Sequence, residues 1–332
     1  MNRTTRICGW TAAATALTAA LTGGQAVAEP VEAQIGMIFS PAAPMVRCGA
    51  DFVAADAALK EAGLNFTVVH SSQLGSEVEM VQQVSSGELE ATIGTASILG
   101  SYVDGLSVLE TYYLYDTVDD VIKVHATDVA GKLFDELLEV ANIRRIGEPW
   151  LYGERHIFGK KALREPADFE GLRLRVPQTS VSIAGAQSLG ASPTPTTYGE
   201  LYLSLQQGIV DAAEAPAAVA NAESFHEPSD YFNKTGHLIT AVPMIVNEDF
   251  WRSLTPEQRT ALNEAATAAA ASVRKCVEEA DEEAYAEWRE SGAVEIVDDV
   301  NREALKANAR AFFSDGFDWS PVYVDLIAEL EN

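Results

Sequence analysis

Basic residues are scarce in this chain. Its 332 residues include 23 Lys and Arg against 49 Asp and Glu, which gives a formal net charge of −26 at neutral pH. Such a charge repels nucleic acid and anionic lipid surfaces, so neither is expected as a partner. It also repels small anions at long range. A site for an anionic ligand would therefore need arginines that are concentrated locally.

Long apolar runs are also lacking, apart from one short run near the N-terminus. Arg3 and Arg6 precede an Ala/Leu/Thr stretch at residues 10–21, and small residues follow at 26–28. This order is typical of an export signal that occupies residues 1–28. The run is too short and too rich in Thr to favour the alternative, a membrane anchor. We expect a soluble, exported protein in the periplasm.

Only three cysteines are present. Cys8 precedes the apolar run, so it is not placed where a lipid-anchoring cysteine would be. Cys48 and Cys276 remain after cleavage, and an exported compartment permits a disulfide between them. The alternative is two separate buried thiols, which behave as small apolar side chains. The sequence leaves both open, and a Cys48–Cys276 disulfide is our prediction.

Motifs for catalysis, cofactors and metals are not found. The five histidines form no H-E-x-x-H, and the chain contains no C-x-x-C, G-x-S-x-G, phosphate loop or G-x-G-x-x-G. We therefore predict no cofactor, no metal site and no enzymatic activity. The alternative is an exported enzyme that acts on an acidic metabolite with His156 or Glu154 as its base.

Apolar and polar residues alternate in a way that predicts an α/β fold. Short apolar runs at 34–38, 65–70 and 91–94 predict strands, and helical spacing predicts helices at 45–62, 76–85, 117–140, 180–189 and 198–207. Thr255-Pro256 begins a further helix that continues to about Ser291 and ends at Gly292. At 1.5 Å per residue this helix would be about 50 Å long, enough to span two domains.

One arginine stands at the end of a predicted strand. The segment 172–176 alternates Leu with Arg and ends at Pro177, which cannot continue a strand ladder. A guanidinium held there can offer two parallel hydrogen bonds to a carboxylate. Arg175 is therefore a candidate ligand for a carboxylate, although a lone strand-end arginine more often pairs with a surface acid.

A set of short motifs occurs in a defined order over nearly all of the chain after residue 30. With these motifs the sequence resembles the solute-binding proteins of tripartite ATP-independent periplasmic (TRAP) transporters, of the dicarboxylate-binding type. The motifs are Gln73-Leu74-Gly75, Gly153-Glu154-Arg155, residues 168–172, Arg175-Val176-Pro177, residues 189–193, Glu200-Leu201-Tyr202, residues 208–211 and Glu214-Ala215-Pro216.

The resemblance implies roles for particular residues. Arg175 would grip a ligand carboxylate, Arg155 would add a second cationic contact, and Tyr198 would form an aromatic wall. The expected set of ligand-contacting residues is Arg175, Arg155, Gln178, Tyr198, Thr95, Glu77, Ala215 and Thr240. Trp150 and Tyr152 could also line the cleft, although core packing is the alternative for Trp150.

Two departures from the family pattern bear on the ligand. Ala215 replaces an asparagine that commonly helps hold the ligand. Thr111-Tyr112-Tyr113 replaces a Leu-Pro-aromatic run. Both changes favour a pocket that is less polar than usual.

The resemblance also implies two α/β lobes that close on the ligand, with the long helix as a brace. We expect lobe I to comprise residues 29–152 and about 240–281, and lobe II residues 153–239 and about 282–332. Hinges are expected near 150–153 and 237–242. The predicted function is that of a monomeric protein that delivers a small carboxylate-containing organic acid to the membrane subunits of a TRAP transporter. A ligand-binding partner of a membrane receptor is a further alternative.

Overall fold

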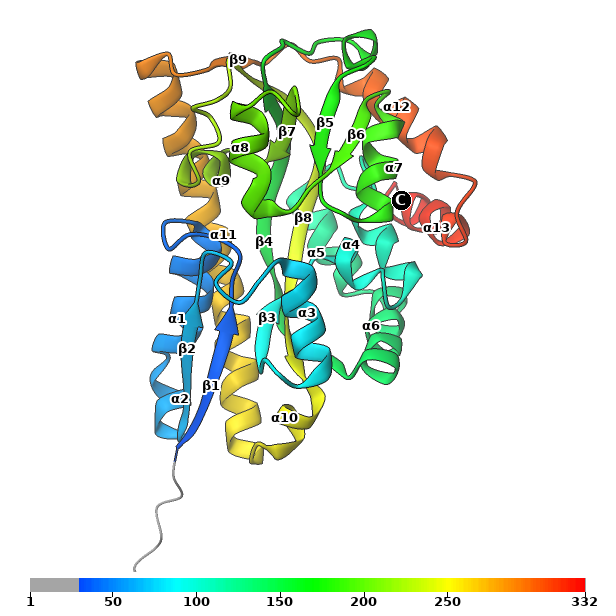
Figure 1. Ribbon diagram of the computed structural model, residues 1–332. Helices are drawn as coiled ribbons and strands as arrows, with labels where there is room; N and C mark the ends of the chain where they lie inside the picture. Colours follow the sequence, from blue (N-terminus) through cyan, green and yellow to red (C-terminus); the bar gives the residue numbers. More distant parts are fainter. Residues whose placement is uncertain (1–29, 332) are drawn as a thin grey trace, which may run out of the picture.

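The computed structural model describes residues 30–331 (Figure 1), so the predicted export signal lies outside the described residues. One mixed sheet has the strand order β2-β1-β3-β8-β4-β7-β5-β6, and β9 pairs with β8. The strands are β1 (Val31–Gly36), β2 (Leu64–Val69), β3 (Ala91–Ile93), β4 (Ile143–Gly159), β5 (Arg173–Val176), β6 (Ser192–Pro195), β7 (Ala212–Ala215), β8 (Tyr231–Asn247) and β9 (Glu295–Val297).

The long strands β4 and β8 connect the two lobes. Each has 17 residues, and they pair antiparallel through the centre of the molecule (Figure 1). Strands β1 to β3 join one lobe through the β3–β8 pairing, and β5 to β7 join the other through β4–β7. The β4–β8 register shifts three times between Ile146 and Ile157. Such irregularities bend a strand, and here they lie between the two lobes.

Helices cover both lobes. They are α1 (Asp51–Ala55), α2 (Ala57–Glu61), α3 (Glu77–Ser86), α4 (Ala96–Leu99), α5 (Val118–His125), α6 (Asp128–Ala141), α7 (Ser180–Ser188), α8 (Leu201–Gln206), α9 (Ala217–Ala222), α10 (Glu248–Ser253), α11 (Pro256–Ser291), α12 (Arg302–Phe313) and α13 (Ser320–Leu330). A π-helix, η1 (Met45–Ala50), and three 3-10 helices, η2 (Asp104–Glu110), η3 (Pro166–Phe169) and η4 (Tyr198–Glu200), accompany them among the described residues. No helix within residues 30–331 is long and apolar enough to cross a membrane.

The helix predicted at 45–62 is interrupted. Asp56 has an extended ψ of 131°, and its Oδ1 accepts a hydrogen bond of 2.9 Å from the Leu59 N–H. An aspartate at this position satisfies a free N–H at the start of a helix, so it begins α2 and ends α1. Periodicity alone does not reveal this break, because alanines flank Asp56 on both sides.

The long helix α11 runs along both lobes (Figure 1) and contacts β4, η1 and α9. Thr255 and Gln258 form a reciprocal capping pair at its start, and Gly292, with a φ of 67°, ends it. The indole of Trp150 in β4 donates a 3.0 Å hydrogen bond to the Ala266 carbonyl in the helix. The indole of Trp288 donates one of 3.0 Å to Asn221 in α9. The helix is thereby attached to both lobes.

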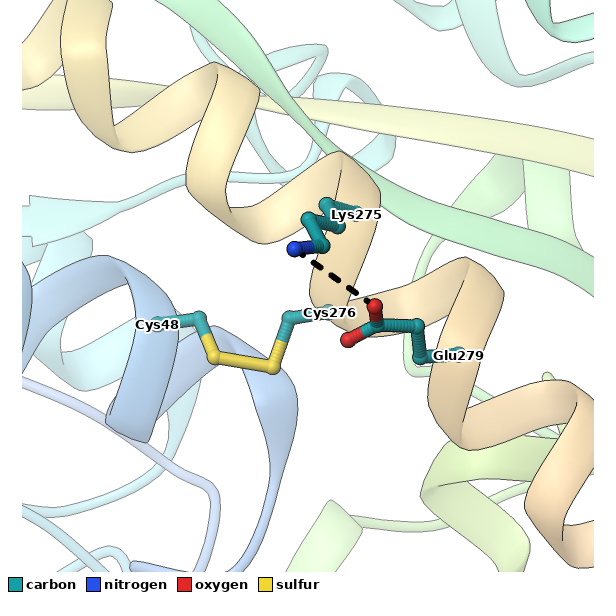
Figure 2. Close-up of a disulfide and its surroundings, with 4 residues drawn as sticks. All are labelled: Cys48, Lys275, Cys276 and Glu279. Atoms are coloured by element: carbon teal, nitrogen blue, oxygen red, sulfur yellow. Dashed lines mark ion pairs between the residues drawn. A yellow bond between two sulfur atoms is a disulfide. The ribbon is translucent and has the colours of Figure 1, made fainter.

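A disulfide attaches the first lobe to the same helix. Cys48 in η1 is bonded to Cys276 in α11, with a Cα–Cα distance of 6.4 Å (Figure 2). The neighbouring Gly49 packs closely against the Trp150 indole. A Cβ at this position would lie only 2.6 Å from the ring, so a larger residue would not fit without a shift. The Lys275–Glu279 ion pair beside the disulfide, at 3.6 Å, is exposed.

Candidate functional site

A cavity lies between the two lobes at the ends of several strands. One wall comes from the first lobe: the segment after β1, the starts of α3 and α4, and the end of η2. The facing wall comes from β4, β5, β7 and the segments that follow β5 and β6. Because strand ends and helix starts bring side chains and backbone N–H groups together, such a crevice is a common ligand site in α/β proteins.

Arg175 is a buried cation without an acidic partner among residues 30–331. It lies in β5 and is 3 % exposed. Its Nε donates to Thr196 Oγ1 at 3.2 Å, and its Nη2 donates to the Thr196 carbonyl at 2.7 Å. Burial lowers the pKa of Arg175, while Glu214 partly offsets this effect. Three of its five N–H donors remain for another partner, since an arginine has five.

Arg155 also lines the cavity, but its charge is already balanced. Its Nε and Nη2 both bond the carboxylate of Glu214, with Nη2 at 2.5 Å from Oε1. Strand β4 pairs with β7 so that Ile157, two residues after Arg155, lies opposite Glu214. This pairing brings the side chains of Arg155 and Glu214 together. Burial opposes ionisation of Arg155, but the Glu214 carboxylate outweighs burial and raises its pKa. Arg155 and Arg175 thus differ, because Arg155 is paired with Glu214, whereas Arg175 has no acidic partner among residues 30–331.

The first-lobe wall carries two carboxyl groups. Glu77 accepts the Thr95 N–H at 2.8 Å, and Glu110 Oε2 accepts the Ser97 N–H at 3.3 Å. Glu110 is 5 % exposed, and its Oε1 has no hydrogen-bond partner among the described residues. Burial raises the pKa of Glu77 to about 7 and also raises that of Glu110. The sequence indicated Glu77 and Thr95 but not Glu110.

Aromatic side chains close the cavity between the lobes. Phe39 from the first lobe lies against Tyr152 in β4 and Tyr198 in the second lobe, with ring centroids 5.5 and 5.3 Å apart. The Tyr198 hydroxyl is buried without a partner in the described chain. Tyr112 also lines the cavity. It belongs to the Thr111-Tyr112-Tyr113 run, where the sequence departs from the family pattern. Trp150 lies instead in the core against α11.

Not every predicted position lies in the wall. Arg175, Arg155, Gln178, Tyr198, Thr95 and Glu77 line the cavity, whereas Ala215 and Thr240 are buried and do not. Successive residues of a strand point to opposite faces, so Glu214 in the wall implies that Ala215 faces away. Thr240 is paired with Gly153, at one of the register shifts of β4.

The two candidate bases lie outside the cavity. His156 is 2 % exposed, its Nδ1 accepts the Gly236 N–H at 2.9 Å, and burial lowers its pKa to about 3. Glu154 pairs with Arg302 at 2.7 Å. Neither is part of the wall. Within residues 30–331, no cluster of three His, Cys, Asp or Glu could hold a metal ion.

The family profile of bacterial extracellular solute-binding protein family 7 matches residues 36–317. The chain belongs to this family. This chain is 26% identical to the C4-dicarboxylate-binding periplasmic protein of Rhodobacter capsulatus over 294 residues. The match covers 88% of this chain and 87% of that protein. This chain is 25% identical to a solute-binding protein of Roseobacter denitrificans over 77% of this chain and 78% of that protein.

Solved structures of this family resemble the whole fold. One is a TRAP periplasmic solute-binding protein from Ochrobacterium anthropi with bound L-fuconate. It has a TM-score of 0.84 and 30% identity over 91% of this chain and 99% of that one. Another, from Actinobacillus succinogenes with bound L-galactonate, also has a TM-score of 0.84, with 28% identity and the same coverage. This chain therefore has the two-lobed fold of TRAP solute-binding proteins, as the sequence predicted.

Proposed function

We propose that this protein binds a small organic acid in the periplasm and delivers it to the membrane subunits of a TRAP transporter. The observation that carries the proposal is Arg175, a buried guanidinium in the interlobe cavity with no acidic partner in the described chain. A buried charge without a partner is costly, so a ligand carboxylate that pairs with it gains a strong interaction. The family and the acids bound by its relatives support the same role.

The acid is expected to lie against Arg175, with Tyr198, Gln178 and Thr95 around it. Because Arg155 is already paired with Glu214, it contributes hydrogen bonding and shape rather than net charge. Binding without turnover is expected, because His156 and Glu154 do not line the cavity.

The direct test is titration calorimetry on Arg175→Ala with an acid found by thermal-shift screening. Loss of the charged partner of a buried carboxylate should cost about 3–5 kcal/mol, or more than 100-fold in affinity. Arg173→Ala is the matched control, since Arg173 lies on the same strand, is exposed and pairs with Asp211. Arg175→Ala affinity within tenfold of the wild type would overturn the proposal, as would the absence of any Arg175-dependent acid in the screen.

The lobes are proposed to move about hinges near residues 150–153 and 237–242, with lobe I as 29–152 and about 240–281, and lobe II as 153–239 and about 282–332. The contacts between Phe39 and Tyr198 and between the Ser40 N–H and Glu223 Oε1, at 2.8 Å, cross between the lobes. They support a closed state in this structure. Small-angle scattering should record a smaller radius of gyration with ligand than without it. An identical radius in both states, for the wild type and for Glu223→Ala, would contradict the hinge.

A further inference from the structure

The charges of the occupied cavity balance only if its first-lobe wall is neutral. Arg155 is paired with Glu214, so Arg175 is the one cavity-lining arginine in the described chain that has no acidic partner. The ligand carboxylate that the proposed function places on Arg175 neutralises it. A negative charge on Glu77 or Glu110 is then uncompensated in a closed cavity, and burial of an uncompensated charge is unfavourable.

Glu110 is the acid whose hydrogen bonds suit the ionised form least. Its side chain is buried, Oε2 accepts the Ser97 N–H at 3.3 Å, and Oε1 has no hydrogen-bond partner in the described chain. A buried carboxylate is stabilised as an anion by two or three donors, which Glu110 lacks. Glu77 is better supplied, because it accepts the Thr95 N–H at 2.8 Å and the Thr95 hydroxyl also favours its ionised form. A proton on this wall therefore belongs on Glu110.

The charged groups that act on Glu110 across the cavity give it little net positive charge. Arg155 and Glu214 act on it with opposite signs and are bonded to each other. Glu77 adds a like charge. The phenols of Tyr112 and Tyr115 follow Glu110 closely in the chain, and burial raises their pKa values, so they stay neutral.

The elements packed against η2 add no cation for Glu110. They are α4, α6, α7, α13 and β8. Helices α4 and α7 contain no titratable side chain, and the charged side chains of α6 and α13 are exposed. In β8, Lys234 pairs with Asp298, and burial holds the pKa of His237 well below its usual range.

Resting on the proposed function, we propose that Glu110 is a neutral carboxylic acid in the occupied cavity and donates its proton to an oxygen of the bound acid, so that binding takes up a proton from solvent. The new O–H bond forms at Oε1, the atom without a partner in the described chain, and water or buffer supplies the proton. A protonated carboxyl group has one such donor to give. The ligand carboxylate and the proton together carry no net charge into the cavity.

Burial raises the pKa of Glu110, and it raises that of Glu77 to about 7, in agreement with this assignment. In the open state the wall is exposed to water, so the pKa of Glu110 lies closer to its usual value of 4.5. The occupied state therefore has the higher pKa. Between the two pKa values binding takes up a proton, and affinity falls as the pH rises. Below the lower value Glu110 is protonated in both states and affinity is constant.

The test is calorimetric titration from pH 6 to pH 9 in buffers with different ionisation enthalpies, which counts the protons taken up per bound ligand. The probe is the tightest Arg175-dependent acid that stays fully ionised over this range, from a screen that includes D-gluconate, D-glucuronate, L-lactate and pyruvate. Arg175 also stays charged throughout. The wild type should take up protons, and its affinity should fall at least tenfold from pH 6 to pH 9.

Glutamine variants assign that fall to the first-lobe wall. Glu110→Gln replaces the acid with an amide that cannot titrate, so the ratio of its affinities at pH 6 and pH 9 should be at least threefold smaller than in the wild type. In Glu110→Gln/Glu77→Gln the ratio should be below threefold. Glu136→Gln is the control, because it removes an exposed carboxyl group from α6, and it should keep the wild-type ratio.

Infrared spectroscopy of the ligand-saturated protein at pH 7 tests Glu110 by itself. The spectrum of the wild type minus that of Glu110→Gln should contain the C=O band of a protonated carboxyl group. Thermal unfolding of each variant identifies misfolding, and a ratio of affinities is unaffected by a partly inactive sample. With an Arg175-dependent ligand in hand, the inference is overturned and the proposed function stands if the wild type takes up no proton, if Glu110→Gln keeps the wild-type ratio, or if the band is missing. The absence of any Arg175-dependent acid would overturn both.

Discussion

Arg155 and Glu214 form a buried ion pair with two parallel contacts in the wall of the interlobe cavity. The pair joins β4 to β7, and it changes the electrostatics of the cavity. Without Glu214 the site would contain two free arginines and would suit a doubly charged anion. With Glu214, Arg175 is the one cavity-lining arginine within residues 30–331 that has no acidic partner, and a single carboxylate is sufficient to balance it.

Glu214→Ala should therefore destabilise the protein. Removal of one partner from a buried ion pair leaves an uncompensated charge and costs about 3–5 kcal/mol of unfolding free energy. Urea denaturation measures the loss. The control is Asp211→Ala, which breaks the exposed pair with Arg173 and should cost at most about 1 kcal/mol. Equal losses in the two variants would contradict the inference that the buried Arg155–Glu214 pair contributes more to stability than the exposed Arg173–Asp211 pair.

Arg175→Lys should lose at least 100-fold in ligand affinity. The arginine bonds Thr196 through Nε and Nη2 and still has further donors for a carboxylate. A lysine ammonium is a point charge and cannot form both sets of bonds. Calorimetry with the ligand identified for the wild type measures the effect, and Arg173→Lys should leave affinity unchanged. If Arg175→Lys retains affinity within tenfold of the wild type, a positive charge alone is sufficient for binding. The prediction of two parallel hydrogen bonds from the guanidinium to the ligand carboxylate would then be wrong.

The stability of the protein should carry a signature of Glu77 between pH 5 and pH 8. Burial raises the pKa of Glu77 from 4.5 to about 7, so between those values the folded state binds more protons than the unfolded state. Stability therefore decreases as the pH rises through this window and becomes flat above it. The unfolding free energy of the wild type minus that of Glu77→Gln should decrease by roughly 2–3 kcal/mol from pH 5 to pH 8.

Glu79, two residues further along the same helix, provides the control for that measurement. Its hydrogen bonds with Ser76 lower its pKa, in the opposite direction to that of Glu77. The corresponding difference for Glu79→Gln should not decrease from pH 5 to pH 8, because a lowered pKa makes stability rise with pH. A flat difference for Glu77→Gln would show that Glu77 is not perturbed.

The Cys48–Cys276 disulfide should stabilise the fold without a direct effect on binding. It closes a long loop, with a sequence separation of 228, and neither cysteine lines the cavity. Removal of a native disulfide typically costs 2–5 kcal/mol. Urea unfolding of the Cys48→Ala/Cys276→Ala double variant measures this cost, and calorimetry should return wild-type affinity. Two free thiols in the unreduced, unfolded wild-type protein would contradict the bond.

The sequence alone was sufficient to predict much of the scaffold. Thr255 and Gly292 bound α11 because a helix start needs a side-chain acceptor and a helix end tolerates glycine at positive φ. The alternation at 172–176 before Pro177 placed Arg175 near a strand end, which is local information. The ordered motifs indicated the family, and with it the two-lobed fold.

Only the tertiary structure decided how the charges of the site are paired. Glu214 reaches Arg155, 59 residues earlier, because β4 and β7 are neighbours in the sheet, and a sequence does not state which strands pair. Glu110 ends a short 3-10 turn with no periodic signal, so its exposure to the cavity follows from how η2 packs. Local patterns determine elements and their ends, whereas the partners of a buried charge depend on contacts between segments that are distant in the chain.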